Sequence, residues 1–165
     1  IVVDINVDQC QLHYRSIHWF ERWKKYIFRF TQKLFRDEVL KIVGNQFYED
    51  KIVNEKFVEV IQKKEREFPT GIVLQGGMNT AIVHTDDIYV LKDKIAIVIS
   101  EEPILFKNIE NGKENICCHI FFVMALTRKN KNEILSFMAE LLEKHEEILK
   151  NFQSRKFCMS GKNMI

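Results

Sequence analysis

The sequence predicts an α/β fold in which a mixed β-sheet is flanked by α-helices. Three observations support this prediction: apolar residues recur at helical spacing in two early segments, several β-rich runs follow, and a third segment with helical spacing lies near the end. The length of 165 residues is typical of one domain, and the hydrophobic content of 46% is enough to build its core.

The first part of the chain is predicted to hold an extension, a strand and a helix. Residues 1–23 have no clear period, so we interpret them as an N-terminal extension of unknown origin. Residues 24–30 alternate apolar and charged side chains, which is typical of a short, half-buried strand. From Asp37 the apolar residues recur every three or four positions, which predicts a helix over residues 37–50.

A second helix is predicted to begin after Asn54, because asparagine favours the N-cap position. Pro69 lacks an amide hydrogen and disfavours helical geometry in the residue before it, so this helix should end near Glu67. Arg66 then lies in the last turn, where the helix dipole stabilises a cation.

The second half of the chain is predicted to supply most of the sheet. Gly76 and Gly77 mark a turn. The β-rich runs after it cover residues 80–84, 88–91, 95–99 and 116–126. The last run is apolar nearly throughout, as in a central strand covered on both faces. A closing helix is predicted over residues 130–149, and residues 153–165 are interpreted as a C-terminal tail.

Composition excludes several classes of function. The 25 basic and 23 acidic residues give a net charge of +2, which is too balanced for a nucleic-acid-binding domain. The four cysteines have no CxxC spacing, so we expect no metal site, and the adjacent Cys117 and Cys118 should point to opposite faces of a strand. No stretch approaches the roughly 18 apolar residues of a membrane span, and no signal peptide is evident, so a cytoplasmic location is expected.

Among the five histidines, His84 is the best candidate for chemistry. It ends the apolar run Ala81-Ile82-Val83 and is followed by Thr85-Asp86-Asp87, so the sheet should hold it while solvent reaches it. A neutral imidazole is a competent nucleophile, although the spacing alone is equally compatible with a structural role. His119 and His145 are interpreted as packed side chains. No nucleotide-binding or hydrolase motif occurs, so a phosphoryl group would have to come from a partner.

Two segments of the chain form a pattern together: Arg66-Glu67-Phe68-Pro69-Thr70-Gly71-Ile72 and Ala81-Ile82-Val83-His84-Thr85. This pair resembles the enzyme IIA family of the bacterial phosphoenolpyruvate-dependent sugar phosphotransferase system. The match is to the fructose/mannitol superfamily, with the galactitol-like branch closest, and it covers residues 24–152 as one IIA-like phosphocarrier domain. The pair of segments is fairly specific, whereas either one alone is a weak signal.

The resemblance implies a site and a set of partners. His84 would be the phosphorylated histidine and Arg66 the arginine beside it, with no cofactor or metal. Phospho-HPr would donate the phosphoryl group and a IIB component would accept it. No nucleic acid would be contacted, and the membrane would be reached only through the permease. The family fold, a layered mixed sheet with helices, agrees with the predicted order of elements.

The sequence departs from the family pattern in two places. Val83 stands where the family usually has proline, which would fix the backbone before His84. The second histidine that mannitol and fructose members carry at the start of the last helix is absent from residues 132–134. Two alternatives to a transport component stay open. The unmatched residues 1–23 leave room for a regulatory IIA-like domain of a transcriptional regulator or antiterminator, and Val83 gives slight support to a degenerate interaction module that is not phosphorylated.

Overall fold

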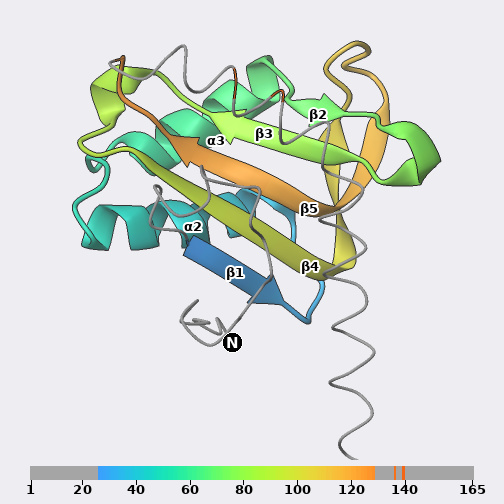
Figure 1. Ribbon diagram of the computed structural model, residues 1–165, viewed down its shortest axis with the longest axis horizontal. Coiled ribbons are helices and arrows are strands. Elements are labelled where there is room, and N and C mark those ends of the chain that lie inside the picture. Colours follow the sequence, from blue (N-terminus) through green and yellow to red (C-terminus); the bar gives the residue numbers. More distant parts are fainter. Residues whose placement is uncertain (1–25, 129–135, 137–138, 140–165) are drawn as a thin grey trace, which may run out of the picture. The chain divides into compact units, whose positions relative to one another are not determined.

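The computed structural model describes residues 26–128 together with Ser136 and Ala139 (Figure 1). The chain divides into two units, residues 1–129 and 130–165, and the fold below is that of the first. Its elements are, in order, β1 (Tyr26–Phe30), α2 (Arg36–Glu49), α3 (Phe57–Glu67), β2 (Gly71–Ile72), the 3-10 turn η2 (Gln75–Gly77), β3 (Thr80–His84), the 3-10 turn η3 (Asp87–Tyr89), β4 (Lys94–Lys107) and β5 (Asn115–Ala125).

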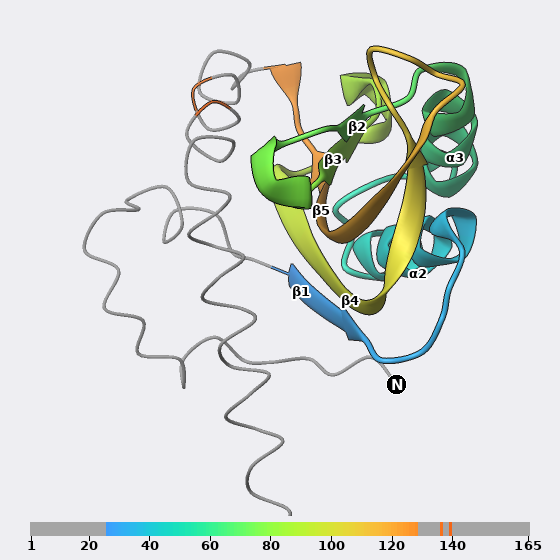
Figure 2. The same ribbon diagram turned by 90° about the vertical axis from the view of Figure 1, so that its right-hand side faces the viewer.

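The five strands form one mixed sheet in the order β1-β4-β5-β3-β2. β4 and β5 are antiparallel, as are β2 and β3, whereas β1 pairs with β4 and β3 with β5 in parallel. Figures 1 and 2 show α2 and α3 side by side on one face of this sheet. The predicted α/β fold with a mixed sheet and flanking helices is confirmed.

The sheet is apolar on both faces because its central strands are buried on both. The face toward α2 and α3 carries Ala81, Val83, Ala96, Val98, Phe121 and Val123, which share one core with helix residues such as Leu40, Phe47 and Ile61. The alternate positions of the same strands are also buried: Ile82, Ile95, Ile97, Ile120, Phe122 and Met124. Burial on both faces confirms that β5 is a central strand.

The helix boundaries follow the sequence prediction closely. α2 and α3 begin and end within a few residues of the expected positions, and Lys64 and Arg66 lie in the last turn of α3. Asn54 lies just before α3, and its side-chain oxygen accepts a hydrogen bond from the Lys56 amide at 3.0 Å. Within residues 26–128, no helix is long and apolar enough to cross a membrane.

Two strand predictions were wrong in part. The run 88–91 is not a strand: the Tyr89 and Val90 amides donate to the Asp86 and Asp87 carbonyls, and these short-range bonds form η3. The run 95–99 is the first half of a longer strand, β4, which continues through Pro103 to Lys107. Its pairing with β5 shifts register between Ile99 and Ile104, where the proline cannot donate to the ladder.

The closing helix and the two terminal segments fall largely outside the described residues. Within the predicted helix 130–149, Ser136 and Ala139 are described and both are helical. The segments 1–23 and 153–165 lie outside the described residues, so their interpretation stays a prediction.

Candidate functional site

His84 is the last residue of β3, and its side chain is exposed. β3 runs parallel to β5, with His84 opposite Met124, so the segments that follow the two strands leave the sheet at the same edge. One strand therefore presents the imidazole, and the chain after β5 passes beside it. As predicted, the sheet holds the backbone of His84 while its side chain is exposed to solvent.

The ring of His84 is held by its own strand. Its Nδ1 atom lies 3.0 Å from the carbonyl oxygen of Ile82. A carbonyl oxygen can only accept a hydrogen bond, so Nδ1 must carry the proton. In the neutral ring the lone pair is then on Nε2, the nitrogen that a reacting group outside the strand can approach.

Two consecutive carboxylates after His84 each hold a cation. Asp86 pairs with Lys64 of α3 at 3.0 Å, and Asp87 pairs with Arg128, beyond the end of β5, at 3.1 Å. Each pair has one largely exposed member: Asp86 is 65% and Arg128 83% exposed, whereas Lys64 is 27% and Asp87 30% exposed. Positive charge from two different elements is thus brought to the loop that follows the imidazole.

Arg66 lies apart from these pairs. Its Nη1 atom donates to Asp37 in the first turn of α2 at 2.7 Å, and within residues 26–128 no hydrogen bond or ion pair joins it to His84. Residues two positions apart on a helix point in different directions, so Lys64 and Arg66 do not share a face of α3. The contact expected between Arg66 and the histidine is therefore not formed in this arrangement.

Glu65, between the two cations, is buried with 1% exposure. Its carboxylate accepts the Thr70 amide at 3.2 Å and the Thr70 hydroxyl at 2.8 Å, which ties the end of α3 to the start of β2. Burial raises the pKa of Glu65, and the two bonds from Thr70 oppose that rise. Gly71 follows directly and must be glycine, since a Cβ there would lie 2.4 Å from the Lys107 carbonyl oxygen.

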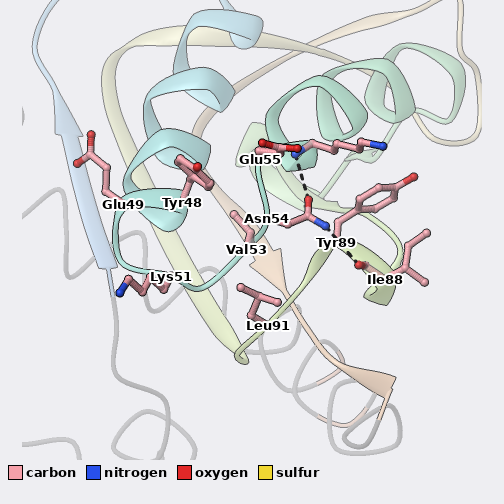
Figure 3. Close-up of a pocket in the computed structure, with 10 residues that line it drawn as sticks. Tyr48, Glu49, Lys51, Val53, Asn54, Glu55, Ile88, Tyr89 and Leu91 are labelled. Carbon is pink, nitrogen blue, oxygen red and sulfur yellow. Dashed lines mark hydrogen bonds between the residues drawn. The ribbon is translucent and has the colours of Figure 1, made fainter.

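A hollow of about 730 Å³ adjoins the loop after His84. The end of α2, the connection to α3 and the segment around η3 form its walls (Figure 3). Tyr48, Ile88 and Leu91 line it and are 50%, 69% and 59% exposed. The side chain of Asn54, near the centre of Figure 3, reaches the Ile88 carbonyl at 3.5 Å and so joins η3 to the helix connection.

The other reactive side chains give no competing site in the described part of the chain. His119 is exposed rather than buried, because it occupies an outward position of β5, and its Nδ1 contacts the Ser100 carbonyl at 3.0 Å. Cys117 is exposed and Cys118 buried, as predicted for neighbours on a strand, and burial raises the pKa of Cys118 to about 12. No group of three metal-ligating side chains occurs among these residues.

Sequence reasoning missed Lys64, Glu65 and Arg128 as neighbours of the site. A partial signal was present: two acidic residues directly after the histidine call for cations nearby. The identity of these cations depends on which α3 side chains point toward the loop and on the parallel register of β3 and β5. Neither can be read from a local sequence pattern.

The five-stranded mixed sheet with its flanking helices is the fold of phosphotransferase-system IIA proteins. The IIA mannitol structure from Escherichia coli matches with a TM-score of 0.54 at 18% identity, covering 71% of this chain and 79% of that one. The IIA-Ntr nitrogen regulatory protein from Neisseria meningitidis matches with a TM-score of 0.57 at 18% identity, covering 73% and 78%. A complex of enzyme IIAMTL with phosphorylated enzyme IIBMTL from Escherichia coli matches with a TM-score of 0.55 at 17% identity, covering 71% and 78%.

The sequence itself identifies the family. Residues 23–156 match the family described as phosphoenolpyruvate-dependent sugar phosphotransferase system, EIIA 2, and the chain belongs to it. No curated protein matches the sequence.

Proposed function

We propose that this domain is a phosphocarrier in which His84 accepts a phosphoryl group from phospho-HPr and passes it to a IIB component. One observation carries the proposal: in a chain of the EIIA 2 family, an exposed histidine at a strand end has Nδ1 bonded to a main-chain carbonyl, and Nε2 makes no hydrogen bond to any residue between 26 and 128. The permease would transport a sugar or alditol of galactitol type, as the resemblance of segments 66–72 and 81–85 implies.

The transfer step needs no proton movement at His84. The Nε2 lone pair forms an N–P bond while the P–N bond of the donor phosphohistidine breaks, and the donor ring keeps the electron pair. Nδ1 holds its proton throughout and continues to donate to the Ile82 carbonyl. In the onward step an acceptor thiolate of IIB takes the phosphorus, and the N–P electrons return to Nε2.

Cations near the loop offset the charge of the transferring group. We assign Lys64 this role, because its ion pair with Asp86 anchors it two residues beyond His84. Arg66, the arginine predicted from the sequence, is the alternative: its pair with Asp37 is largely exposed and therefore weak, and a guanidinium with five donors uses one of them there.

The donor would also cover the hollow beside η3. Ile88 is four residues after His84 and so lies at most about 14 Å from it along an extended chain. A standard interface of about 800 Å² per partner, taken as a disc, extends roughly 16 Å from its centre. Ile88 is therefore close enough to His84 to be reached by a donor centred on Nε2, and the exposed Ile88 and Leu91 would be its apolar anchors.

The test is transfer of labelled phosphate from phosphoenolpyruvate through enzyme I and HPr. Wild type should acquire an acid-labile, base-stable label, His84→Ala should acquire none, and His119→Ala should be labelled normally because His119 lies elsewhere on β5. A label on His84→Ala would overturn the assignment. Adding a IIB protein should then remove the label; a regulatory domain would keep it.

A further inference from the structure

A chain of contacts leads from the buried carboxylate of Glu65 to the ring of His84. Glu65 accepts the amide and hydroxyl of Thr70, which lies directly before β2. Thr70 faces Ile82 across the β2–β3 pairing, and the Ile82 amide donates to the Thr70 carbonyl at 3.4 Å. The Ile82 carbonyl accepts the His84 Nδ1 proton at 3.0 Å.

Thr70 and Ile82 form only one of the two backbone hydrogen bonds that such a pair of opposite residues usually forms. In an antiparallel ladder a hydrogen-bonded pair exchanges two bonds, one from each amide. Here the bond from Ile82 to Thr70 is present, but the Thr70 amide donates to Glu65. The Ile82 carbonyl that would have received it is the one that binds His84. Two side chains thus take the place of the missing ladder bond: the Glu65 carboxylate accepts the Thr70 amide, and the His84 imidazole donates to the Ile82 carbonyl.

The buried charge of Glu65 needs a reason, because burial of a carboxylate is costly and an apolar residue would pack there without that cost. A helix-to-strand tie is one reason. A second reason is that Glu65 accepts the hydrogen bond of the Thr70 amide. Without this side-chain acceptor the amide would donate to the Ile82 carbonyl and compete with His84 for it. A carbonyl can accept two bonds, so this competition is graded.

We infer that Glu65 is a positioning residue for His84, because it holds the Thr70 amide away from the Ile82 carbonyl and so selects Nε2 as the reacting nitrogen. The consequence for phosphoryl transfer rests on the proposed function. The consequence for the tautomer of His84 does not, so the two can be tested separately.

The experiment compares four proteins: wild type, Glu65→Ala, Glu65→Gln and Thr70→Val. Glu65→Ala releases the Thr70 amide. Glu65→Gln keeps an oxygen that can accept it. Thr70→Val deletes the hydroxyl bond and loses stability but leaves the amide on Glu65, so it is the matched control for a merely structural effect. Ring ¹⁵N shifts of His84, assigned with His84→Ala, report the tautomer, and thermal melts report folding.

Wild type, Glu65→Gln and Thr70→Val should hold the Nδ1–H tautomer, whereas Glu65→Ala should populate Nε2–H, the form that free histidine prefers. Transfer from phospho-HPr to Glu65→Ala should fall at least about twofold, in proportion to the fraction of competent ring. If Glu65→Ala does not fold, Glu65→Leu fills the volume and serves in its place.

An unchanged His84 tautomer in the folded alanine or leucine variant would overturn the inference. So would a shift in Thr70→Val as large as that in Glu65→Ala, because the effect would then follow from stability alone. If wild type takes no phosphate from phospho-HPr, the proposed function fails, and the ¹⁵N shifts still decide the role of Glu65.

Discussion

Removal of single charges from the last turn of α3 should show which cation serves the phosphoryl group. We compare Lys64→Met with Arg66→Met, since each change deletes one positive charge and keeps an unbranched side chain. Lys64 is held at 3.0 Å from Asp86 on the His84 loop, whereas Arg66 is held at 2.7 Å from Asp37 on α2. Lys64→Arg keeps the charge and serves as the conservative control.

The expected size of the effect follows from these contacts. A unit charge at about 4 Å from the phosphoryl group is worth about 4 kcal/mol at an effective dielectric constant near 20. Lys64 already forms an ion pair with Asp86, so only part of this attraction is available to the phosphoryl group. We therefore expect Lys64 to contribute the net free energy of one charge-assisted hydrogen bond, about 1.5–3 kcal/mol, or about 10- to 150-fold in the transfer rate. Arg66 is 52% exposed, and its loss should cost less than about 1 kcal/mol, under about fivefold.

The assay is a single-turnover transfer from phospho-HPr, stopped by rapid quench, with melting curves to show that each variant folds. Lys64→Arg should keep most of the wild-type rate. If Arg66→Met slows transfer more than Lys64→Met does, the assignment of Lys64 is refuted, and the sequence-based role of Arg66 is restored.

Three other outcomes are expected. Ile88→Asp should raise the KM for phospho-HPr at least about 10-fold but leave labelling by phosphoramidate unchanged. The control is Ile109→Asp, on the chain after β4, where Ile109 is 58% exposed; this variant should match wild type with both donors. Equal KM values for Ile88→Asp and wild type would show that the hollow is not part of the interface. Val83→Pro should lower the melting temperature, because Val83 is buried within β3 and pairs with β5, and a higher melting temperature would contradict that. Native protein treated with a thiol reagent near pH 8 should be modified at Cys117 and spared at Cys118, as peptide mapping would show, and modification of Cys118 would contradict its burial.

Much of the fold was predictable because local patterns encode it. The helical stripe after Asp37, the stop signal at Pro69 and the apolar run of β5 each fix an element by themselves. The run 88–91 misled for a physical reason: Ile88 and Leu91 are apolar but exposed and line the hollow, and their exposure cannot be recognised from the local sequence pattern. The predicted run 95–99 was too short, because β4 continues beyond it with a register shift between Ile99 and Ile104.

The candidate site was predictable at its centre and not at its edges. His84 could be found because a strand end followed by acidic residues is a sequence-local feature. Its neighbours come from α3 and from the chain beyond β5, and the side chain that reaches the loop is decided by helix direction and strand register. Arg66 was predicted on the strength of a motif, but two positions along a helix are enough to turn a side chain toward a different partner.

The pairing order of the strands has a consequence for how the domain folds. β4 and β5 are joined by a connection in which Asn108 and Glu114 are hydrogen-bonded, so this hairpin closes a small loop. β1 must find β4 across two helices, and β3 must find β5 across the whole of β4. Because small loops close first, the hairpin should form early and the strand that carries His84 should dock onto it later. The imidazole then gains its neighbours only when the long-range contacts are complete, so a partly folded chain lacks the assembled surroundings of His84.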